Sequence, residues 1–343
     1  MSSRHTPFII PIFLQHLGCP HRCLFCNQVP ITGASPPFNP STQSVADEIE
    51  AWIARSRSSH HRSVQVAFYG GSFTGLPIDH QHQYLMAVRP FITSGKVNEI
   101  RISTRPDYIY PSTPEFLKYF GVTTVEIGVQ SMNQDVLDQN LRGHTVNHVT
   151  QAISLLKQYS FVIGAQIMIG LPNESNAAAI SGAKRLIVLQ PNFVRIHPAL
   201  VIMGSGLARQ YHEGSYRPLS MNRAVALSAR LTQLFNKHQI PVIRTGLQPS
   251  PELEDSIIAG PYHPAFGELV KARLFFNWIR HQLHDHKQRP CKMIIAQQDR
   301  SLLTGHGNNS LRRLTQLGLL DRVAIAFEDL GGQRGEIQVR GVA

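Results

Sequence analysis

The stretch Gly18-Cys19-Pro20-His21-Arg22-Cys23-Leu24-Phe25-Cys26-Asn27 decides the fold, because its C-x3-C-x2-C loop directly follows a strand-like apolar run, Phe8–Leu14. Three thiolates this close in sequence can bind one soft metal centre, so Cys19, Cys23 and Cys26 are the predicted metal ligands. A [4Fe–4S] cluster held by three cysteines leaves one iron open for a further ligand. The alternative is a zinc site, which needs a fourth ligand. His21 lies inside the loop, and Cys291 is remote in sequence.

Cysteine usage and the N-terminus indicate the compartment. The chain has 343 residues and four cysteines, which disfavours a disulfide scaffold, and Cys291 is expected to be a buried free thiol. The residues from Met1 to the first strand lack the pattern of a signal peptide, so a cytoplasmic location is expected. No apolar stretch approaches the roughly 20 residues of a membrane-spanning helix, so no membrane partner is expected.

The charge balance favours an anionic partner. The chain carries 33 Lys and Arg against 22 Asp and Glu, a formal net charge of +11. Such an excess favours nucleic acid over an acidic protein as partner. The basic residues form no tail, so any contact with nucleic acid would use a folded face.

Six short apolar runs alternate with helix-like segments. Runs rich in Val, Ile and Phe are typical of parallel strands that are buried on both faces. Six such units fall short of the eight of a full TIM barrel, which predicts an α/β fold with a partial, open (β/α)6 TIM-like barrel. The predicted strands are Phe8–Leu14, Val64–Tyr69, Glu99–Ser103, Thr124–Val129, Phe161–Ile169 and Asn192–His197.

The regular alternation of strand-like and helix-like segments changes after Gly260. We therefore predict a barrel domain over residues 1–260, followed over residues 261–343 by a helical linker and a small α+β subdomain. The subdomain pattern is strand, helix, glycine turn, helix and two strands.

The glycine turn of this subdomain resembles the loop of a KH-like RNA-binding unit, which clamps a nucleic-acid backbone. Gly305 and Gly307 form the turn, Asn308 replaces the second motif glycine, and Arg312 and Arg313 are placed to meet phosphates. The alternative is a packing subdomain that merely contains a glycine turn.

Further motifs follow the predicted strands. The second strand ends in Tyr69-Gly70-Gly71-Ser72-Phe73-Thr74, and later segments are Ile102–Asp107, Val125–Ser131, Leu141–His144 and Gln166–Pro172. Together with the cysteine loop, these motifs resemble the radical S-adenosylmethionine (SAM) enzymes. In particular they resemble the radical SAM domain of the Elp3-like family, whose members modify the wobble uridine of tRNA. The resemblance runs from about residue 7 to residue 260. Some segments are shared with relatives of oxygen-independent coproporphyrinogen oxidase.

The resemblance implies a [4Fe–4S] cluster and SAM as cofactors. A reduced cluster cleaves SAM to a 5′-deoxyadenosyl radical, which abstracts hydrogen from a substrate. It also implies an electron donor such as flavodoxin or ferredoxin, with tRNA or another RNA as substrate. Two alternatives remain open. One is a radical SAM reaction on a small-molecule or tetrapyrrole-type substrate, and the other is a non-catalytic iron–sulfur protein that binds RNA or carries metal.

The resemblance also assigns roles to residues of the SAM site. The Gly70-Gly71 turn would bind the methionine amino group through backbone oxygens, with Ser72 in place of the family's Glu. Arg142 and Gln130 are candidates for the methionine carboxylate, because arginine offers a bidentate fork. The predicted cofactor-binding residues are Phe25, Gly70, Gly71, Ser72, Thr104, Glu126, Gln130, Arg142, Gln166 and Ile169.

Three of these assignments have structural alternatives. Arg142 is alternatively a solvated charge in its loop. Glu126 on its strand needs partners if it is buried, so an ion pair with Arg101 or Arg105 explains it as well as a SAM contact does. Ile169 is a candidate for packing on adenine or a plain core residue.

One departure from the Elp3-like pattern bears on the reaction. Elp3 proteins carry a C-terminal acetyltransferase domain, whereas residues 261–343 are few and contain no acetyl-CoA loop. We therefore expect a relative of the Elp3 radical SAM domain without the acetyltransferase domain.

Overall fold

The computed structural model describes residues 7–14, 18–19, 23–27, 31, 40–55, 63–284, 290–331 and 338–341. The chain forms two compact units. The first contains residues 1–220 and 235–262, and the second contains residues 221–234 and 263–343. Among the described residues, no helix is both long enough and apolar enough to cross a membrane.

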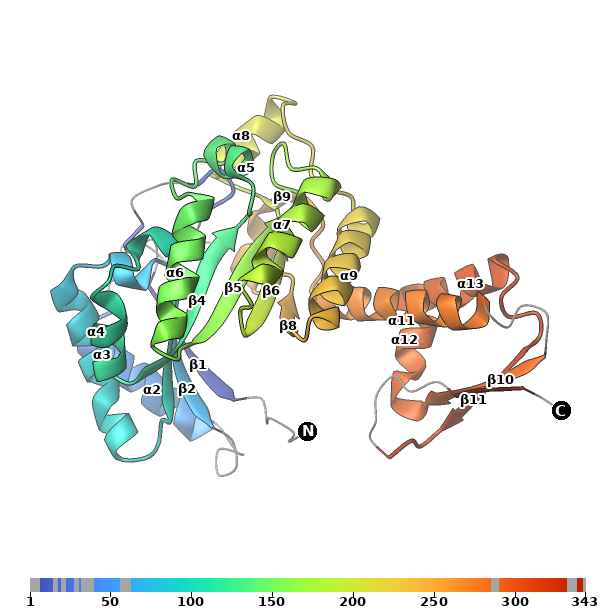
Figure 1. The fold of residues 1–343 in the computed structure, drawn as a ribbon, viewed down its shortest axis with the longest axis horizontal. Coiled ribbons are helices and arrows are strands. Elements are labelled where there is room, and N and C mark those ends of the chain that lie inside the picture. The colour runs from blue at the N-terminus through green and yellow to red at the C-terminus, as the bar shows by residue number, and fades with distance from the viewer. Residues whose placement is uncertain are drawn as a thin grey trace. The chain divides into compact units, whose positions relative to one another are not determined.

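The first unit is built on a parallel sheet of seven strands in the order β1-β2-β3-β4-β5-β6-β8. Figure 1 shows this twisted, open sheet, which confirms the partial barrel. Six strands match the predicted runs, and β8 is an additional strand at the edge beside β6. The strands are β1 Phe8–Phe13, β2 Val64–Tyr69, β3 Glu99–Thr104, β4 Val122–Gln130, β5 Val162–Ile169, β6 Phe193–Pro198 and β8 Val242–Thr245.

Helices α4, α6 and α7 lie along one face of this sheet (Figure 1), here called the outer face. Side chains alternate between the two faces of a strand, and on the outer face they are apolar. Val125, Ile127, Ile163 and Ile196 are among those with no exposed surface. The helices of this unit are α2 Thr42–Arg55, α3 Ile78–Thr93, α4 Thr113–Tyr119, α5 Gln134–Gln139, α6 Val146–Gln158, α7 Asn176–Val188, α8 Gly206–His212 and α10 Pro251–Ser256.

The opposite face of the sheet, here called the inner face, is polar. The strands are buried on this face too, as expected, since Gln65, Arg101, Thr124 and Glu126 are buried, but the buried side chains here are polar rather than apolar. A full TIM barrel fills its interior with branched apolar side chains, whereas polar groups line the interior of this open barrel. The inner-face side chains include Gln65, Tyr69, Arg101, Ser103, Thr124, Glu126, Gln166, Arg195 and His197.

Local signals set the ends of the covering helices. Thr145 caps α6 by accepting a hydrogen bond from the backbone N–H of His148, whose ring nitrogen in turn accepts from the Thr145 N–H. Val149, Ile153 and Leu156 then lie on one buried face of the helix. A small two-stranded sheet pairs β7 (Val201–Ile202) with β9 (Ile257–Ala259).

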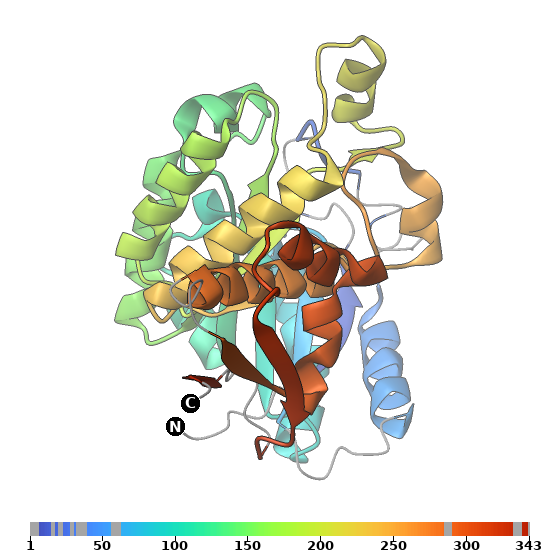
Figure 2. The same cartoon turned by 90° about the vertical axis from the view of Figure 1, so that its right-hand side faces the viewer.

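The second unit contains a three-stranded sheet in the order β11-β10-β12. Figure 2 shows this sheet beside its helices. Two helices connect the parallel strands β10 and β11, and β12 is antiparallel to β10. Cys291 is buried in the apolar core of this unit, as expected. The elements are α11 Phe266–His284, β10 Cys291–Ala296, α12 Arg300–Thr304, α13 Asn309–Gln316, β11 Val323–Glu328 and β12 Gln338–Gly341, and α9 Met221–Lys237 contributes residues 221–234.

Candidate active site

The cysteine loop packs directly on the turn that follows β2. Gly18, at the start of the loop, has φ +70°, a conformation that favours glycine. A Cβ atom on Gly18 would lie 2.8 Å from the carbonyl carbon of Gly75 and closer still to the carbonyl oxygen of Ser72. A Cβ on Gly75 would in turn collide with the carbonyl oxygen of Gly18. Glycine at both positions therefore allows the backbone of the cysteine loop to touch the 72–75 turn.

Gly18→Ala is expected to displace the cysteine loop and to lower iron incorporation severalfold. The matched control is Gly214→Ala, because Gly214 has φ +75° with open space around its Cβ position. Both changes carry the cost of a left-handed residue, about 1–2 kcal/mol, but only the first collides with backbone. Iron analysis after anaerobic reconstitution measures the effect. Equal iron content in the two variants would contradict the packing argument.

The predicted cysteine ligands lie in a cationic neighbourhood. Cys23 is buried, and its Sγ lies 3.5 Å from Nη1 of Arg142. Burial raises the pKa of the half-buried Cys19 thiol, and the positive charges of Arg142 and Arg105 oppose that rise. Cys26 is half-buried, and its backbone N–H donates to the Cys23 carbonyl across a turn at 3.0 Å.

The three thiols are not gathered into a metal-binding group. Within the described residues, no three Cys, His, Asp or Glu side chains are placed to hold a metal ion. His21, the alternative zinc ligand, lies outside the described residues.

Arg142 connects the cysteine loop with the end of β4. Its Nη2 donates to the carbonyl oxygen of Gly128 at 2.9 Å. A side chain at Gly128 would push both Arg142 and Gln130 aside, because a Cβ atom there would lie 2.7 Å from Arg142 Nη2 and 3.0 Å from Gln130 Nε2. Gln130 itself has φ +63°, a strained conformation for a residue with a side chain.

Buried polar atoms in this region lack partners. Nε of Arg142, Oε1 of Gln130 and Nη1 of Arg105 are buried without a hydrogen-bond partner in the part of the chain that the structure describes. Buried polar groups are nearly always hydrogen-bonded in folded proteins, so unpaired ones indicate a place for a ligand. Arg142 and Gln130 were predicted to bind the methionine carboxylate, and the structure brings these two side chains together.

The Gly70-Gly71 turn is fixed by hydroxyl groups. Gly70 has φ +99°, and its Cβ position lies 3.3 Å from the Leu14 carbonyl oxygen, so glycine is required there. Ser72 is buried, and its Oγ lies 2.9 Å from Thr104 Oγ1, which also contacts Thr74 Oγ1 at 2.6 Å. The hydroxyls of Ser72 and Thr104 therefore join the turn to the end of β3.

Glu126 is the centre of a buried ion-pair network on the inner face. Its carboxylate lies 2.8 Å from Nη1 of Arg101 and 2.8 Å from Nε of Arg195. The Tyr69 hydroxyl donates to Glu126 at 3.1 Å. Of the two expected partners, Arg101 is present, whereas Arg105 pairs with Asp107 at 2.8 Å. This set of contacts favours the structural ion-pair explanation for Glu126.

The other predicted cofactor residues, Phe25, Gln166 and Ile169, lie in three different surroundings. Phe25 is half-buried and packs against an apolar cluster that contains Leu171 and Leu207. Gln166 lies half-exposed on the inner face, in register between Gly128 and Arg195. Ile169 has no exposed surface and lies on the outer face, which favours the core explanation over an adenine contact.

Sequence reasoning missed a carboxyl group beside this region. Glu174, in the loop after β5, accepts a hydrogen bond from the Ser131 hydroxyl at 2.8 Å. Burial raises the pKa of Glu174 to about 7, although the Ser131 hydrogen bond opposes the rise. The sequence signal was weak, because Glu174 lies outside the strand pattern and meets Ser131 only through the fold.

Two histidines are buried in this unit, His144 in the segment between α5 and α6 and His197 near the end of β6. Burial lowers the pKa of His144 to about 2, with a further contribution from the charge of Arg142. Burial likewise lowers the pKa of His197 to about 3, and the charges of Arg195 and Arg244 add to this effect. Both imidazoles are therefore neutral at physiological pH.

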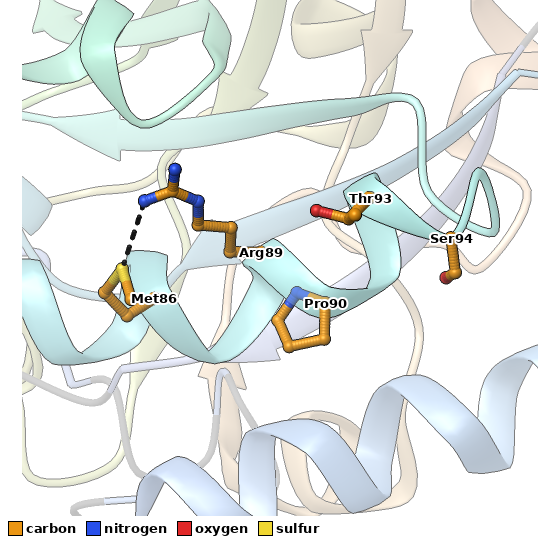
Figure 3. Close-up of a pocket in the computed structure, with 5 residues that line it drawn as sticks. All are labelled: Met86, Arg89, Pro90, Thr93 and Ser94. Atoms are coloured by element: carbon orange, nitrogen blue, oxygen red, sulfur yellow. Dashed lines mark hydrogen bonds between the residues drawn. The ribbon is translucent and has the colours of Figure 1, made fainter.

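A surface hollow of about 490 Å³ is separate from these groups. Figure 3 shows its lining, which comes from α3 and the residue that caps its C-terminus: Met86, Arg89, Pro90, Thr93 and Ser94. Arg89 lies over Met86, with 3.9 Å between Nη1 and Sδ. The hollow contains none of the predicted site residues.

Two family models match the chain. Residues 16–180 match the radical SAM superfamily, and residues 191–275 match the radical SAM C-terminal domain. Together these segments cover more than half of the chain and contain the cysteine loop and the glycine turn. The chain belongs to the radical SAM superfamily. Its cofactors are those of the superfamily, a [4Fe–4S] cluster and SAM.

Relatives with similar sequences include archaeal and eukaryotic proteins. An uncharacterized protein of Methanocaldococcus jannaschii is 27% identical over 265 residues, which are 74% of this chain and 79% of that protein. Elongator complex protein 3 of Saccharomyces cerevisiae is 29% identical over 50% of this chain and 34% of that protein. The human protein of the same name is 30% identical over 50% of this chain and 35% of that protein. The chain thus spans about a third of the length of these two Elongator proteins.

A solved structure shares the fold. The archaeal Methanocaldococcus infernus Elp3 with an N-terminal deletion superposes with a TM-score of 0.61 at 20% identity. The match covers 80% of this chain and 63% of that chain. Streptococcus suis SuiB bound to S-adenosylmethionine has a TM-score of 0.50 at 12% identity, over 70% of this chain and 50% of that one.

The residues of this radical SAM chain fit its cofactors in their chemistry. Thiols suit iron, and the positive charges of Arg142 and Arg105 oppose the rise that burial causes in the pKa of Cys19. The unpaired atoms of Arg142 and Gln130 suit the carboxylate of an amino acid, and backbone carbonyls in a glycine turn suit its ammonium group.

Proposed function

We propose that this chain is a radical SAM enzyme that modifies RNA, with tRNA as the substrate. The cluster and SAM supply a carbon radical that abstracts hydrogen from the substrate. Cys19, Cys23 and Cys26 hold the cluster, while Arg142, Gln130 and the Gly70-Gly71 turn orient the methionine end of SAM. The resemblance to the Elp3-like family and the net charge of +11 support the RNA substrate.

The observation that carries the RNA part of the proposal is a group of arginines in the second unit. Burial lowers the pKa of Arg273 on α11, and the charges of Arg313 and Arg280 lower it further. Three guanidinium groups that repel one another are stabilised when phosphates neutralise them. Arg313 also stacks over the Phe276 ring at 5.6 Å, which holds the cation in place.

Arg313 lies on α13, the helix that follows the predicted glycine turn. Gly305 ends α12 with φ +66°, and its Cβ position is filled by Ser310, so glycine is required there. Gly307 has φ +59° in open space. Arg312 and Arg313 follow on the exposed surface of α13. A helix–glycine turn–helix between parallel strands supports the KH-like hypothesis for RNA binding.

The function is tested by anaerobic incubation of the reconstituted enzyme with SAM, dithionite and total tRNA, followed by mass spectrometry of nucleosides. We expect tRNA to stimulate formation of 5′-deoxyadenosine and a nucleoside of altered mass to appear. Formation of 5′-deoxyadenosine with neither effect of tRNA would reject the RNA substrate and leave the small-molecule alternative.

The double variant Arg312→Gln, Arg313→Gln is expected to weaken tRNA binding about tenfold. It should also flatten the slope of log K against log salt by up to about two units, since each lost phosphate contact removes about one. Filter binding over a salt series measures both quantities. The control double variant Lys271→Gln, Lys292→Gln removes the same charge from exposed ion pairs of the same unit. If both double variants lose the same affinity for tRNA and the same salt slope, binding depends on overall charge, and the KH-like site is rejected.

A further inference from the structure

The inner face of the barrel contains a third arginine, Arg244, in addition to the two that pair with Glu126. Arg101 and Arg195 share the carboxylate of Glu126. Arg244 on β8 lies in register with Arg195 on β6, so the two cations are neighbours at this edge of the sheet. Arg244 donates a hydrogen bond from Nη2 to the side-chain amide oxygen of Gln248, a neutral group. Within the described residues, no carboxylate forms a salt bridge with Arg244.

The electrostatics of Arg244 indicate a missing counter-charge. Burial lowers the pKa of Arg244, and the positive charge of Arg195 lowers it further. The Tyr69 and Glu126 side chains act in the opposite direction, which places the Arg244 guanidinium within reach of the inner-face network. Two half-buried guanidinium groups side by side destabilise each other, and an anion between them removes that cost.

A hydrogen-bond donor without a partner lies beside these arginines. His197 is two residues after Arg195 on β6, so it lies on the same face of the sheet. The side chain is 8% exposed, and neither ring nitrogen has a hydrogen-bond partner among the described residues. A neutral imidazole always carries one N–H donor, which a ligand on this face can accept. Two cations and one free donor thus gather at the β6–β8 edge.

We propose that the half-barrel binds an oxyanion of the substrate between Arg195 and Arg244, with His197 donating a hydrogen bond to it. The proposal rests on the proposed function, since it takes the barrel interior as the place of reaction. The ligand chemistry is a phosphate or a carboxylate, both of which match the guanidinium fork. The site differs from that of Arg142, which contacts the carbonyl of Gly128 on β4 and the thiol of Cys23.

The first test titrates inorganic phosphate, and separately acetate, into the reconstituted holoenzyme labelled with 15N in its histidine rings. The variant His197→Gln assigns the His197 signals. We expect these signals to shift saturably with one of the anions. Arg244→Gln should raise the dissociation constant about tenfold, as for the loss of one charge-assisted hydrogen bond. The matched control Arg89→Gln removes an exposed arginine from the outer helix α3 and should bind as the wild type does.

Each other outcome overturns the proposal. If neither anion shifts His197, or if Arg244→Gln and Arg89→Gln have the same dissociation constant, the β6–β8 edge is no anion site. If Arg244→Gln weakens binding of SAM by the same factor as binding of phosphate, Arg244 belongs to the cofactor site instead.

A competition experiment separates the two sources of the oxyanion. If tRNA displaces phosphate from His197, the anion is a phosphate of the RNA, and this supports both proposals. If acetate binds more tightly than phosphate and tRNA does not compete, the anion site stands and a carboxylate-bearing small substrate replaces RNA. The anion site and the RNA substrate can therefore fail independently.

Discussion

Replacing any one of Cys19, Cys23 and Cys26 with alanine is expected to abolish both the iron–sulfur chromophore and the reductive cleavage of SAM. In the proposed site, three thiolates from one loop would supply the protein ligands of the cluster, so losing one would leave a second iron without its ligand. Cys23 should be the most sensitive position, because it is buried and in contact with Arg142. Iron and sulfide analysis, visible absorption and assay of 5′-deoxyadenosine measure the loss.

The control for this experiment is Cys291→Ala. Cys291 is buried in the core of the second unit, and burial raises the pKa of its thiol, so it is a poor ligand and a packing residue. This variant should keep the full iron content and SAM cleavage. Full iron content in one of the three loop variants would contradict the ligand assignment. Stoichiometric zinc in anaerobic, iron-reconstituted protein would do the same and favour the zinc alternative.

The parts of the fold that the sequence predicted are those with local signals. The six longer strands are short apolar runs, and the cysteine loop and glycine turn follow two of them, so their positions could be read along the chain. The strand Val242–Thr245 was missed because it has only four residues and carries Arg244 in its middle. A run that short has no period to distinguish it from a loop.

The polar character of the inner face was not predicted, for a different reason. Apolar and polar residues alternate in Arg101-Ile102-Ser103 and in Glu126-Ile127-Gly128, which indicates one apolar face and one polar face. We gave more weight to the many Val and Ile residues than to this alternation. The alternation indicated the polarity of the inner face correctly, since the residues that face inward in these segments include Arg101, Ser103 and Glu126.

The partners in the site could not be predicted because they depend on the order of strands. Arg195 is 69 positions from Glu126, and no pattern within either segment indicates that they meet. The contact between Gly18 and Gly75 likewise joins loops after neighbouring strands. The chemistry of the side chains suggested the predicted roles of Arg142 and Gln130, whereas the structure gives a reason for Gly128, whose Cβ position lies close to both side chains.

The variant Glu126→Gln is expected to lower the free energy of unfolding by about 3–5 kcal/mol, the range for breaking a buried ion pair on one side. The amide keeps the shape of the carboxylate but leaves Arg101 and Arg195 without their shared negative charge. Urea denaturation of the purified protein measures the change. The control Glu115→Gln alters an exposed carboxylate on α4 and should change stability by less than about 0.5 kcal/mol.

A double-mutant cycle separates the ion pair from loss of packing. If Arg195 is stabilised mainly by Glu126, adding Arg195→Gln to Glu126→Gln removes an uncompensated cation. The double variant should then be at least about 1 kcal/mol more stable than the sum of the two single losses predicts. Strict additivity would show that the two side chains contribute independently and that the network does not act as a unit. Because Arg101 also contacts Glu126, the double variant should still be less stable than the wild type, with one arginine left unpaired.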